Sequence, residues 1–413
     1  MKILFIHPTG NQNVREAAKG LQKAGLLGLF VTSIAVFRGT VLYRVGKFRP
    51  FSELHKRVFD AVLHPLTKVF PFKEGGRLFS SKFGFNKLIK HEKGFFCVDS
   101  VYRSLDKKVS NRLKLWKQKY DIGVVYGYED GCAYSFEKAR VLNMRCIYDL
   151  PTGYWRAARD LLKSETERRP EWADTITGFY DSGNKLKRKD TELLYADTVI
   201  VASTFTADTL KYCPNSLPPV KVIPYGFPEV FDGRIYPDFN DQRKIKLLFV
   251  GKLSQQKGIA DLFEAVNELS NLFELTLIGA KANRNIYLES ELKKHSYLPP
   301  LPHPEVLQQM RQHDILIFPS LFDGFGLVMT EAMSQGTPVI ATERSAGPDL
   351  IKHGRNGWLF RAGDACGLKT LLLQIAEQPL QISTAGKAAM ETARQRPWAV
   401  YGRELAEAIK IFS

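Results

Sequence analysis

The sequence predicts an α/β protein with two parallel sheets in tandem, and two observations lead to this fold class. The chain opens with an apolar strand, a turn that contains glycine and an amphipathic helix (KILFIH, PTGNQN, VREAAKGLQKAG). The same order of strand, loop and helix starts again at Lys244 with KIKLLFVGKLSQQKG. Strands that alternate with helices favour parallel sheets. Because 413 residues exceed what one hydrophobic core normally holds, we expect two domains.

Short apolar runs predict the other strands of the first domain, to which we assign residues 1–228. Each run has the length and the continuous apolar character of a strand that is buried on both faces. These expected strands are DIGVVYGY (121–128), RCIYDLP (145–151), DTVIVAS (197–203) and VKVIPYG (220–226). Residues 38–120 interrupt the alternation of strands and helices, so we expect them to form an insertion.

The second domain is expected to span residues 244–395. Residues 229–243 (EVFDGRIYPDFNDQR) are polar and contain Pro and Gly, which is typical of an interdomain linker. Expected strands follow at FELTLIGA, DILIFPS and TPVIAT, separated by helices such as HPEVLQQMRQH. Residues 396–413 form an amphipathic terminal helix. Ligands of parallel sheets bind at the carboxyl ends of the strands, and both sets of strand ends could face one cleft.

The charge balance indicates an anionic partner. The chain has 59 Lys and Arg against 43 Asp and Glu, a formal net charge of +16. Such an excess suits nucleic acid, an acidic membrane surface or a substrate linked to a nucleotide. The five cysteines are far apart and form no CxxC pair, which indicates neither a disulfide framework nor a zinc site and favours a reducing compartment. They are Cys97, Cys132, Cys146, Cys213 and Cys366.

The chain shows neither a signal peptide nor a transmembrane segment. Its start, MKILFIHPTG, resembles a strand and a turn rather than a signal peptide. The apolar stretch 25–37 is shorter than the roughly 20 residues that a bilayer span needs. We therefore expect a cytoplasmic protein, which could also bind peripherally to the inner face of the membrane.

One loop of the second domain combines bare backbone with two acids. SLFDGFGLVMTEAMSQGTPVIAT (320–342) follows a strand, and a helix is expected from Gly326 or Leu327 to near Gly336. Helix N-termini carry unpaired N–H groups with partial positive charge, and glycines let a phosphate approach them. Glu331, one turn into this helix, could accept hydrogen bonds from two vicinal hydroxyls, with Asp323 nearer the reacting end of a ligand. Alternatively, both acids are merely solvated.

A second loop could hold the charge of a diphosphate. GKLSQQKG (251–258) also follows a strand and precedes a helix, and it carries Lys252 and Lys257. Two fixed ammonium groups could clamp a diphosphate, although solvated lysines are common in a basic protein. The two loops belong to βα units about 70 residues apart in the sequence, and together they favour a nucleotide-sugar site more strongly than either does alone.

These motifs carry a resemblance to a known family. GKLSQQKG, FPSLFDGFGLVMTEAMSQGTPVIAT and GPDLIKHGRNGWLF resemble the nucleotide-sugar domain of retaining glycosyltransferases of family 4, with the GT-B fold. The resemblance extends from about Lys244 to Asp364. Weaker similarity appears in ELLYADTVIVASTFTADTL and VKVIPYGFP. PWAVYGRELAEAI resembles the family's C-terminal helix, which crosses back to the first domain, whereas residues 38–120 match nothing that we can place.

The resemblance implies roles for the loop residues. Glu331 would hold the ribose, and Asp323, where the family usually has Glu, would bind hydroxyls of the donor sugar. Lys252 and Lys257 would neutralise the diphosphate leaving group, so these four residues are the candidate catalytic set. The other implied donor-binding residues are Gly10, Asn11, Gly251, Pro302, Phe325, Gly326 and Leu327.

The first domain departs from the family pattern at two places. PTGNQN offers only Gly10 where the family often has two adjacent glycines, and Asn11 and Asn13 could donate hydrogen bonds instead. The histidine that the family tends to place at the end of a middle strand is absent here.

The sequence at that strand end reads VVYGYEDGCAYSF, so Glu129 and Asp130 are tentative site residues. His7, at the end of the first strand, is a candidate substitute, and the alternative is an ordinary loop histidine whose hydrogen bonds are satisfied.

The resemblance implies a retaining transfer from a nucleoside-diphosphate sugar to a hydroxyl of a glycan, a lipid-linked or a small-molecule acceptor. In the family this reaction needs no metal, so we expect none and no other cofactor. Two alternatives remain at this point. One is a nucleotide-sugar epimerase with the same fold, and the other is a subunit that binds sugar nucleotides without catalysis.

The basic and aromatic stretch from residue 38 to 96 allows three interpretations. Apolar residues recur at helical spacing at Phe48, Phe51, Leu54, Val58 and Val62, with basic residues between them. Such a helix could lie on an anionic membrane surface. It could instead be an acceptor-side insertion whose aromatic residues form a core. Nucleic acid is the third partner, but no nucleic-acid-binding motif accompanies the charge, and we expect no such partner.

Overall fold

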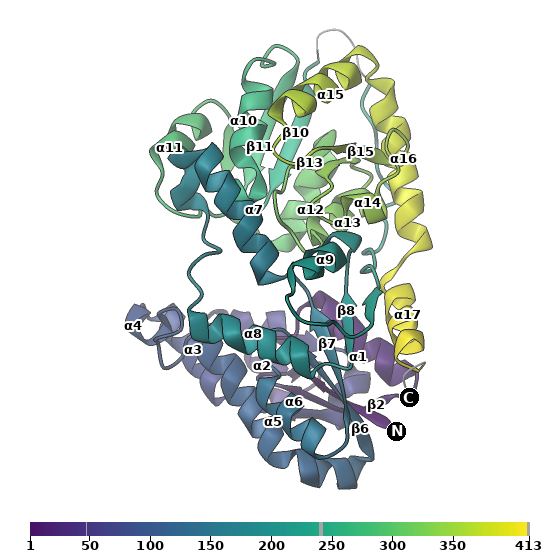
Figure 1. Cartoon of the computed structure of the whole chain (residues 1–413). Coiled ribbons are helices and arrows are strands. Elements are labelled where there is room, and N and C mark those ends of the chain that lie inside the picture. Colours follow the sequence, from purple (N-terminus) through teal and green to yellow (C-terminus); the bar gives the residue numbers. More distant parts are fainter. Residues whose placement is uncertain (47, 239–242, 411–413) are drawn as a thin grey trace.

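The protein consists of two α/β domains stacked end to end, as the computed structural model in Figure 1 shows. The structure describes residues 1–46, 48–238 and 243–410. The first domain lies at the bottom of the view and the second at the top, with a parallel sheet at the centre of each. This is the GT-B arrangement that the sequence predicts, with helices on both faces of each sheet.

The first sheet has seven strands in the order β5-β2-β1-β6-β7-β8-β9, all paired in parallel. These strands are β1 (Lys2–Ile6), β2 (Leu27–Thr32), β5 (Thr67–Val69), β6 (Ile122–Tyr128), β7 (Arg145–Leu150), β8 (Thr198–Val201) and β9 (Val220–Val222). All four of the apolar runs predicted after the insertion form strands here. Two further short strands, β3 (Val36–Phe37) and β4 (Val58–Phe59), pair separately.

Residues 38–120 are only partly an insertion, because β5 pairs with β2 at the edge of the first sheet and α5 packs on the sheet. The helices of this range are α2 (Val41–Val45), η1 (Arg49–Arg57), η2 (Ala61–Leu66), α3 (Phe72–Lys82), α4 (Asn86–Ile89) and α5 (Val98–Tyr120). The others are α1 (Gln12–Lys23), α6 (Ala133–Val141), α7 (Trp155–Arg168), η3 (Pro170–Thr175), α8 (Gly183–Tyr195), α9 (Thr204–Thr209) and η4 (Leu210–Tyr212).

The second sheet has six parallel strands in the order β12-β11-β10-β13-β14-β15. The strands are β10 (Ile245–Val250), β11 (Phe273–Ile278), β12 (Ser296–Leu298), β13 (Ile315–Phe318), β14 (Val339–Thr342) and β15 (Gly357–Phe360). Its helices are η5 (Gln255–Lys257), α10 (Ile259–Asn267), α11 (Ile286–Leu292), α12 (His303–Gln312), α13 (Leu327–Ser334), α14 (Gly347–Leu350), α15 (Ala365–Glu377) and α16 (Leu380–Gln395). The expected linker 229–243 joins the two sheets, and residues 239–242 lie outside the described residues.

The last helix, α17 (Trp398–Lys410), returns to the first domain and packs against α1, as the sequence predicts (Figure 1). The two helices cross closely because glycines meet there: a Cβ on Gly20 would lie 2.5 Å from the Cα of Gly402. Leu405 and Ile409 are buried on the inner face of α17. Residues 411–413 of the expected terminal helix lie outside the described residues.

One segment of the first half belongs in space to the second domain, which a division at residue 228 does not anticipate. Helix α7 and the turn η3 pack beside α10 and α11 (Figure 1). Trp172 is buried in the core of the second domain, 6.0 Å from the ring of Phe263. The guanidinium of Arg169 lies 2.9 Å from the carboxylate of Asp261. The chain therefore crosses between the domains before α7 and again before α8, as well as at the linker.

The amphipathic helix predicted from Phe48 to Val62 does not form. This stretch is broken into η1, β4 and η2, with Pro50 near the start of η1 and Pro65 inside η2. The helix is interrupted because Val58 and Phe59 pair in parallel with Val36 and Phe37, and β-branched and aromatic residues favour strands. The described residues contain no helix that is both long enough and apolar enough to cross a membrane. All five cysteines are free thiols.

Candidate functional site

A cleft of about 520 Å³ lies between the domains, at the carboxyl ends of strands from both sheets. The first domain contributes Asn11, Asn13, Pro151 and Tyr225 to its walls. The second domain contributes Val250, Gly251, Lys257, Leu301, His303, Val306, Phe318, Asp323, Phe325, Gly326, Leu327, Val328 and Glu331. Hollows of similar volume beside α17 and beside β11 lie away from these strand ends, so this cleft is the candidate site.

The loop between β13 and α13 brings bare backbone to the cleft. Gly326 adopts a left-handed conformation (φ +86°) immediately before α13 begins at Leu327. A side chain is disfavoured at that φ, and a Cβ there would also lie 2.7 Å from the ring of Phe318. The first N–H groups of a helix have no partner within it. Because residues 325–328 line the cleft, these donors and the positive end of the helix dipole are available to an anion.

The first domain presses on this loop and fixes its shape. A Cβ on Gly324 would lie 2.2 Å from the carbonyl oxygen of Pro151, so only glycine fits there. The carbonyl oxygen of Gly324 accepts hydrogen bonds from the hydroxyls of Ser203 (2.6 Å) and Thr206 (2.9 Å), both buried. The loop before α13 in the second domain is therefore held in place by the first domain.

The loop before α10 places Lys257 opposite Asp323. The ammonium of Lys257 pairs with the Asp323 carboxylate and lies 5.6 Å from the centre of the Phe318 ring. The other oxygen of Asp323 accepts from the N–H of Phe325 at 3.3 Å. This pairing holds a cation beside the N-terminus of α13, and an incoming phosphate could share it.

Glu331 projects from the second turn of α13, where the sequence predicts it. Its carboxylate lies 3.0 Å from Nε2 of His303, the first residue of α12. The hydrogen bond to Glu331 raises the pKa of His303 above its ordinary value, although partial burial opposes the rise. The carboxylate borders both the cleft and a neighbouring hollow of about 480 Å³, so it can reach a ligand that extends along the helix.

The cleft wall contains Asn13, which the sequence predicts as a donor, and Tyr225, which no sequence motif indicates. Tyr225 is buried, and its ring packs 4.8 Å from that of Phe325. Its hydroxyl accepts a hydrogen bond from the amide of Asn13 at 3.1 Å. Tyr225 follows β9 and Asn13 lies in α1, so only the folded chain brings them together. They join the first domain to the loop that ends at Gly326.

Of five other predicted residues, two line the cleft and three lie outside its wall. Lys252 is exposed and donates to the hydroxyl of Thr177 at 2.9 Å, outside the cleft wall. Pro302 caps the start of α12, beside the wall residues Leu301 and His303. Gly251 and Asn11 line the wall. Gly10, with φ +68°, lies behind Asn11 against the ring of Phe59.

His7 lies behind the turn that follows β1, outside the cleft wall. Its Nδ1 accepts hydrogen bonds from the backbone N–H groups of Thr9 (3.1 Å) and Gly10 (2.9 Å). Burial, and secondarily the charge of Arg57, lowers the pKa of His7 to about 3. A neutral ring that accepts two backbone hydrogen bonds is a structural part of the turn.

Glu129 and Asp130 form a partly buried network of charges with α8 rather than part of the cleft wall. Glu129 accepts from the ammonium of Lys189 (3.3 Å) and the hydroxyl of Thr152 (3.3 Å). Asp130 lies 3.4 Å from Lys185 and from Arg188. Thr152 adjoins the wall residue Pro151, so this network borders the site from the first domain.

The helix that follows these two acids has a closed N-terminus. Glu192 of α8 accepts hydrogen bonds from the N–H groups of Asp130, Cys132 and Ala133 at 2.7 to 3.2 Å. Asp106 of α5 accepts from the next two N–H groups, at 2.8 and 2.9 Å. Burial raises the pKa of both carboxyl groups, and the backbone donors oppose the rise. The start of α6 is therefore occupied by carboxylates of the protein itself.

Comparison with known proteins shows what the second domain resembles. Residues 244–378 match the family described as Glycosyl transferases group 1. A 30% identical relative over 168 residues is the amylovoran biosynthesis glycosyltransferase AmsK of Erwinia amylovora. A D-inositol 3-phosphate glycosyltransferase of Corynebacterium efficiens is 33% identical over 172 residues. These matches cover 36% and 38% of this chain, and the chain spans about 40% of the length of each relative.

Solved structures resemble the chain over its full length. A sucrose-phosphate synthase from Thermosynechococcus elongatus has a TM-score of 0.65 and 18% identity, covering 100% of this chain and 99% of its own. HepE of Anabaena in complex with UDP-glucose has a TM-score of 0.60 and 18% identity, with complete coverage of both chains. At such identities the likeness shows the GT-B fold.

Proposed function

We propose that this protein is a glycosyltransferase that moves a sugar from a nucleoside-diphosphate sugar to a hydroxyl acceptor, with retention of configuration. The observation that carries the proposal is the open N-terminus of α13 in the interdomain cleft, flanked by the ion pair of Lys257 and Asp323 and by Glu331. The match of the same segment to Glycosyl transferases group 1 supports it. So do the printed names of the relatives, and HepE, which has the same fold, binds UDP-glucose.

The geometry supports a division of roles along the ligand. The two oxygens of Glu331 suit the two hydroxyls of a ribose, because one carboxylate can accept from both. The N–H groups of Gly326 and Leu327 suit the diphosphate. Asp323, at the loop, suits hydroxyls of the donor sugar. It lies four residues before Leu327, where α13 begins, and Glu331 lies four residues after that start.

Lys257 and the helix N-terminus supply the electrostatic part of catalysis. As the bond between C1 of the sugar and the diphosphate oxygen breaks, negative charge develops on the leaving group. An ammonium and backbone dipoles that already face this position stabilise that charge without reorganisation. Lys252 lies at the rim beside Thr177, from where its flexible side chain could turn toward a bound diphosphate. We propose that no metal ion takes part, so activity should survive EDTA.

The proposed transfer balances without an enzyme nucleophile. The acceptor oxygen forms its bond to C1 on the face that the diphosphate leaves, and the acceptor proton passes to the departing phosphate oxygen. Asp323 is engaged by Lys257, and this pairing suits a group that orients hydroxyls. The sugar, the base and the acceptor are not specified by these residues. A glycan, a lipid-linked sugar and a small molecule all remain suitable acceptors.

The first experiment is a thermal-shift panel of UDP, GDP, ADP, TDP and their common sugars on the wild-type protein. We expect stabilisation by one nucleotide, because a ligand that binds only the folded state raises the unfolding temperature. Glu331→Ala should remove that stabilisation, whereas Ile286→Ala, on the exposed face of α11, should keep it.

The preferred nucleotide sugar then serves as donor in a transfer assay with proton NMR of the product anomer. A retained anomer supports the proposal, and an inverted one contradicts the mechanism. Binding without turnover on any acceptor would make the chain a binding subunit. Conversion of the free donor without an acceptor would indicate an epimerase.

A further inference from the structure

We propose that residues 72–95, which form helices α3 and α4 and their turns, dock on an anionic membrane surface. This segment, the α3–α4 tip, projects from the first domain at the left of Figure 1. Seven apolar side chains in and beside it are more than a third exposed. They are Phe72, Phe79, Phe83, Phe85, Leu88, Phe95 and Val98. Soluble proteins rarely expose so many large apolar groups together without a partner.

The exposed phenylalanines form two contiguous groups. Phe79 lies 4.5 Å from Phe83 and 6.1 Å from Phe85, measured between ring centres. Phe72 lies 6.4 Å from Phe95 in the second group. Each group therefore presents an apolar surface larger than one ring, rather than isolated exposed side chains.

The opposite side of α3 fixes which face looks outward. Glu74 is fully buried and pairs with Arg57 and Arg77. Ser80, nearly two turns further, is also buried. Because one face of α3 is anchored in this way, Phe72 and Phe79, seven residues apart on the other face, must remain exposed.

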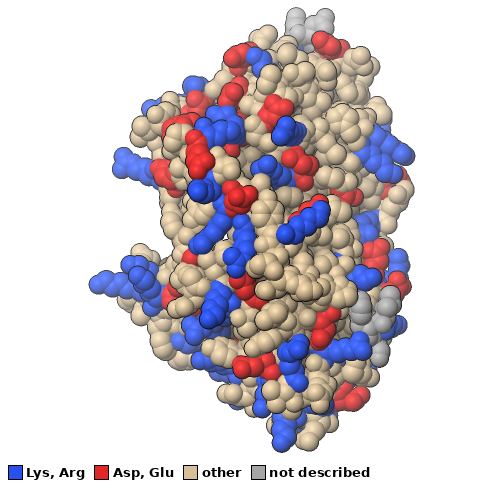
Figure 2. All heavy atoms as spheres, viewed as in Figure 1, with Lys and Arg blue, Asp and Glu red and all other residues tan. Residues whose placement is uncertain are grey.

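The charge of the tip matches an anionic surface. Its exposed charged side chains are basic: Lys82, Lys87, Lys90 and Lys93. Its two acids do not oppose them, since Glu74 is buried between arginines and Glu92 accepts hydrogen bonds from Ser182. Figure 2 shows blue side chains gathered on the projection where Figure 1 places α4. Lysines beside exposed aromatic rings are typical of surfaces that bind acidic lipid headgroups and insert rings at the interface.

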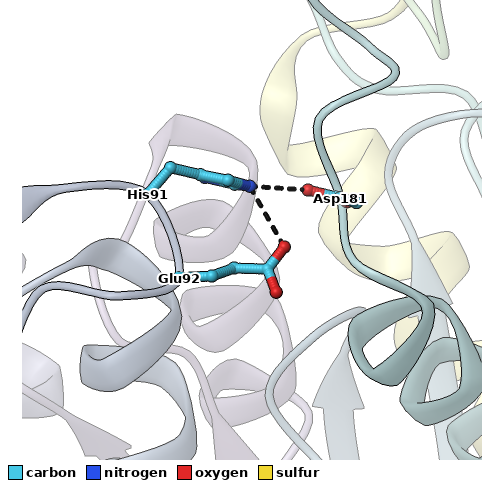
Figure 3. A group of neighbouring side chains, drawn as sticks. All are labelled: His91, Glu92 and Asp181. Atoms are coloured by element: carbon cyan, nitrogen blue, oxygen red, sulfur yellow. Dashed lines mark hydrogen bonds and ion pairs between the residues drawn. The ribbon is translucent and has the colours of Figure 1, made fainter.

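The base of the tip is tied to the segment that crosses between the domains (Figure 3). Nε2 of His91 lies 3.1 Å from Asp181 and 3.2 Å from Glu92. A metal ion would suit these three side chains less well than the present contacts, because the ammonium groups of Lys185 (2.9 Å) and Lys189 (3.6 Å) already engage Asp181. The cluster therefore acts as a brace for the tip.

The brace also places the tip relative to the candidate site. The crossing segment contains Thr177, which contacts Lys252 at the rim of the cleft, and Asp181, which contacts His91. A membrane that holds the tip would therefore lie near the cleft, which suits an acceptor carried on a lipid. This last consequence rests on the proposed function, whereas the docking itself does not.

Vesicle flotation of the full chain tests the docking. Vesicles of phosphatidylcholine alone are compared with vesicles that also contain phosphatidylglycerol, at low and at high salt. We expect binding only to the anionic vesicles, weakened by salt because exposed charges are screened. Phe79→Ser/Phe83→Ser/Phe85→Ser and, separately, Lys87→Glu/Lys90→Glu should each reduce the partition coefficient about tenfold or more.

Matched controls lie near the far end of α5, a helix that spans about 34 Å at 1.5 Å per residue. Leu115→Ser removes an exposed apolar side chain there, and Lys114→Glu/Lys119→Glu reverses two exposed charges. Neither should change flotation. Unchanged thermal unfolding of all variants shows that they are folded.

Three outcomes would overturn the proposal. The wild-type protein could fail to float with anionic vesicles, or the tip variants could float as well as the controls. Alternatively, the tip variants could convert a dimer to a monomer without changing flotation, which would make the tip an interface between two copies of the chain. Loss of nucleotide binding alone would count against the proposed function and leave the docking standing.

Discussion

Two junctions between a strand and a helix, one in each domain, have similar sequences. The helix N-terminus is covered by acidic side chains at one junction and borders a cleft at the other. The β6–α6 junction reads YGYEDGCA and the β13–α13 junction reads PSLFDGFGL, and both place an Asp-Gly pair between a buried strand and a helix. At the first, Glu192 and Asp106 accept hydrogen bonds from the helix N-terminus. At the second, the backbone of residues 325–328 borders a cleft.

The difference shows what makes a helix N-terminus available to a ligand. Both termini have unpaired N–H groups and partial positive charge, so the motif alone does not distinguish them. Residues distant in sequence determine whether the N-terminus is covered, because Glu192, which covers the start of α6, lies about 60 residues after that helix begins. At α13 the nearest acid, Asp323, is held aside by Lys257.

The largest effect is expected at the open junction. Lys257→Ala should raise the activation barrier by about 2–4 kcal/mol, the range found when one donor is removed from an oxyanion hole. The physical reason is loss of the cation that faces the leaving diphosphate. Turnover of the preferred nucleotide sugar, measured as nucleoside diphosphate released, checks this expectation. Near-normal kcat would contradict the role of Lys257.

A double variant distinguishes direct stabilisation of the leaving group by Lys257 from an indirect effect through its ion pair with Asp323. Lys257→Ala leaves Asp323 without its cation, and the unpaired carboxylate could itself repel a diphosphate. Lys257→Ala/Asp323→Asn removes that charge. If the double variant stays as slow as the single one, the ammonium is needed for catalysis. Recovery would mean that Lys257 only neutralises Asp323.

The next effect is expected at the closed junction, and on stability instead of catalysis. Glu192→Ala should lower the free energy of unfolding by roughly 2–3 kcal/mol, because buried N–H donors of α6 lose their acceptor. Denaturant unfolding measures it. Glu192→Gln keeps a carbonyl acceptor and should cost less. A nucleotide affinity that changes with little loss of stability would show that α6 takes part in ligand binding.

The sequence predicts the open junction better than the closed one for a physical reason. Strand, glycine, helix and acids lie within about twenty residues around Asp323, so local spacing carries the geometry. The carboxylates that close α6 come from α5 and α8, and no local pattern announces them. For the same reason the sequence points to Asn13 as a hydrogen-bond donor but not to Tyr225, its partner in the cleft wall, because the two side chains meet only after folding.

In the fold as well, features set by local sequence were predicted and features set by distant contacts were missed. Strands buried on both faces are continuous apolar runs, and a strand lies at all four predicted places after the insertion, although β9 ends four residues before the predicted end of its run. The packing of Trp172 on the second domain was missed, because its contacts are about 90 residues away. The helix expected from Phe48 to Val62 is wrong because Val58 and Phe59 pair with Val36 and Phe37, about 22 residues earlier, which local spacing does not reveal.

A buried acid behind the closed junction should make stability depend on pH. Asp149 lies in β7, paired with Tyr128 of β6. Its side chain is 2% exposed and accepts a hydrogen bond from the hydroxyl of Tyr126 at 2.6 Å. Burial raises the pKa of Asp149 to about 7, and the hydrogen bond from Tyr126 opposes the rise. The native state then holds a proton that the unfolded state releases between about pH 4 and pH 7, so the free energy of unfolding falls as pH rises through that window.

Asp149→Asn keeps the size and an acceptor but cannot ionise. The wild-type protein should lose about 1–3 kcal/mol more than this variant between pH 5 and pH 8. Parallel denaturant titrations at the two pH values measure the difference. Asp197→Asn, at the far end of the neighbouring β7–β8 pair, is the control. Equal pH dependence in wild type and Asp149→Asn would show that Asp149 is ionised throughout.

The smallest effect is expected at the acid of the open junction. Glu331 contacts the exposed side chain of His303, and the hydrogen bond between them raises the pKa of His303. Glu331→Gln removes the negative charge, so the pKa of His303 should fall in the variant. An NMR titration of the ring protons, with His353 as an internal control on another loop, measures this. A midpoint unchanged by the substitution would mean that the two side chains do not pair in solution, and Glu331 would then be as free for a ribose at low pH as at high pH.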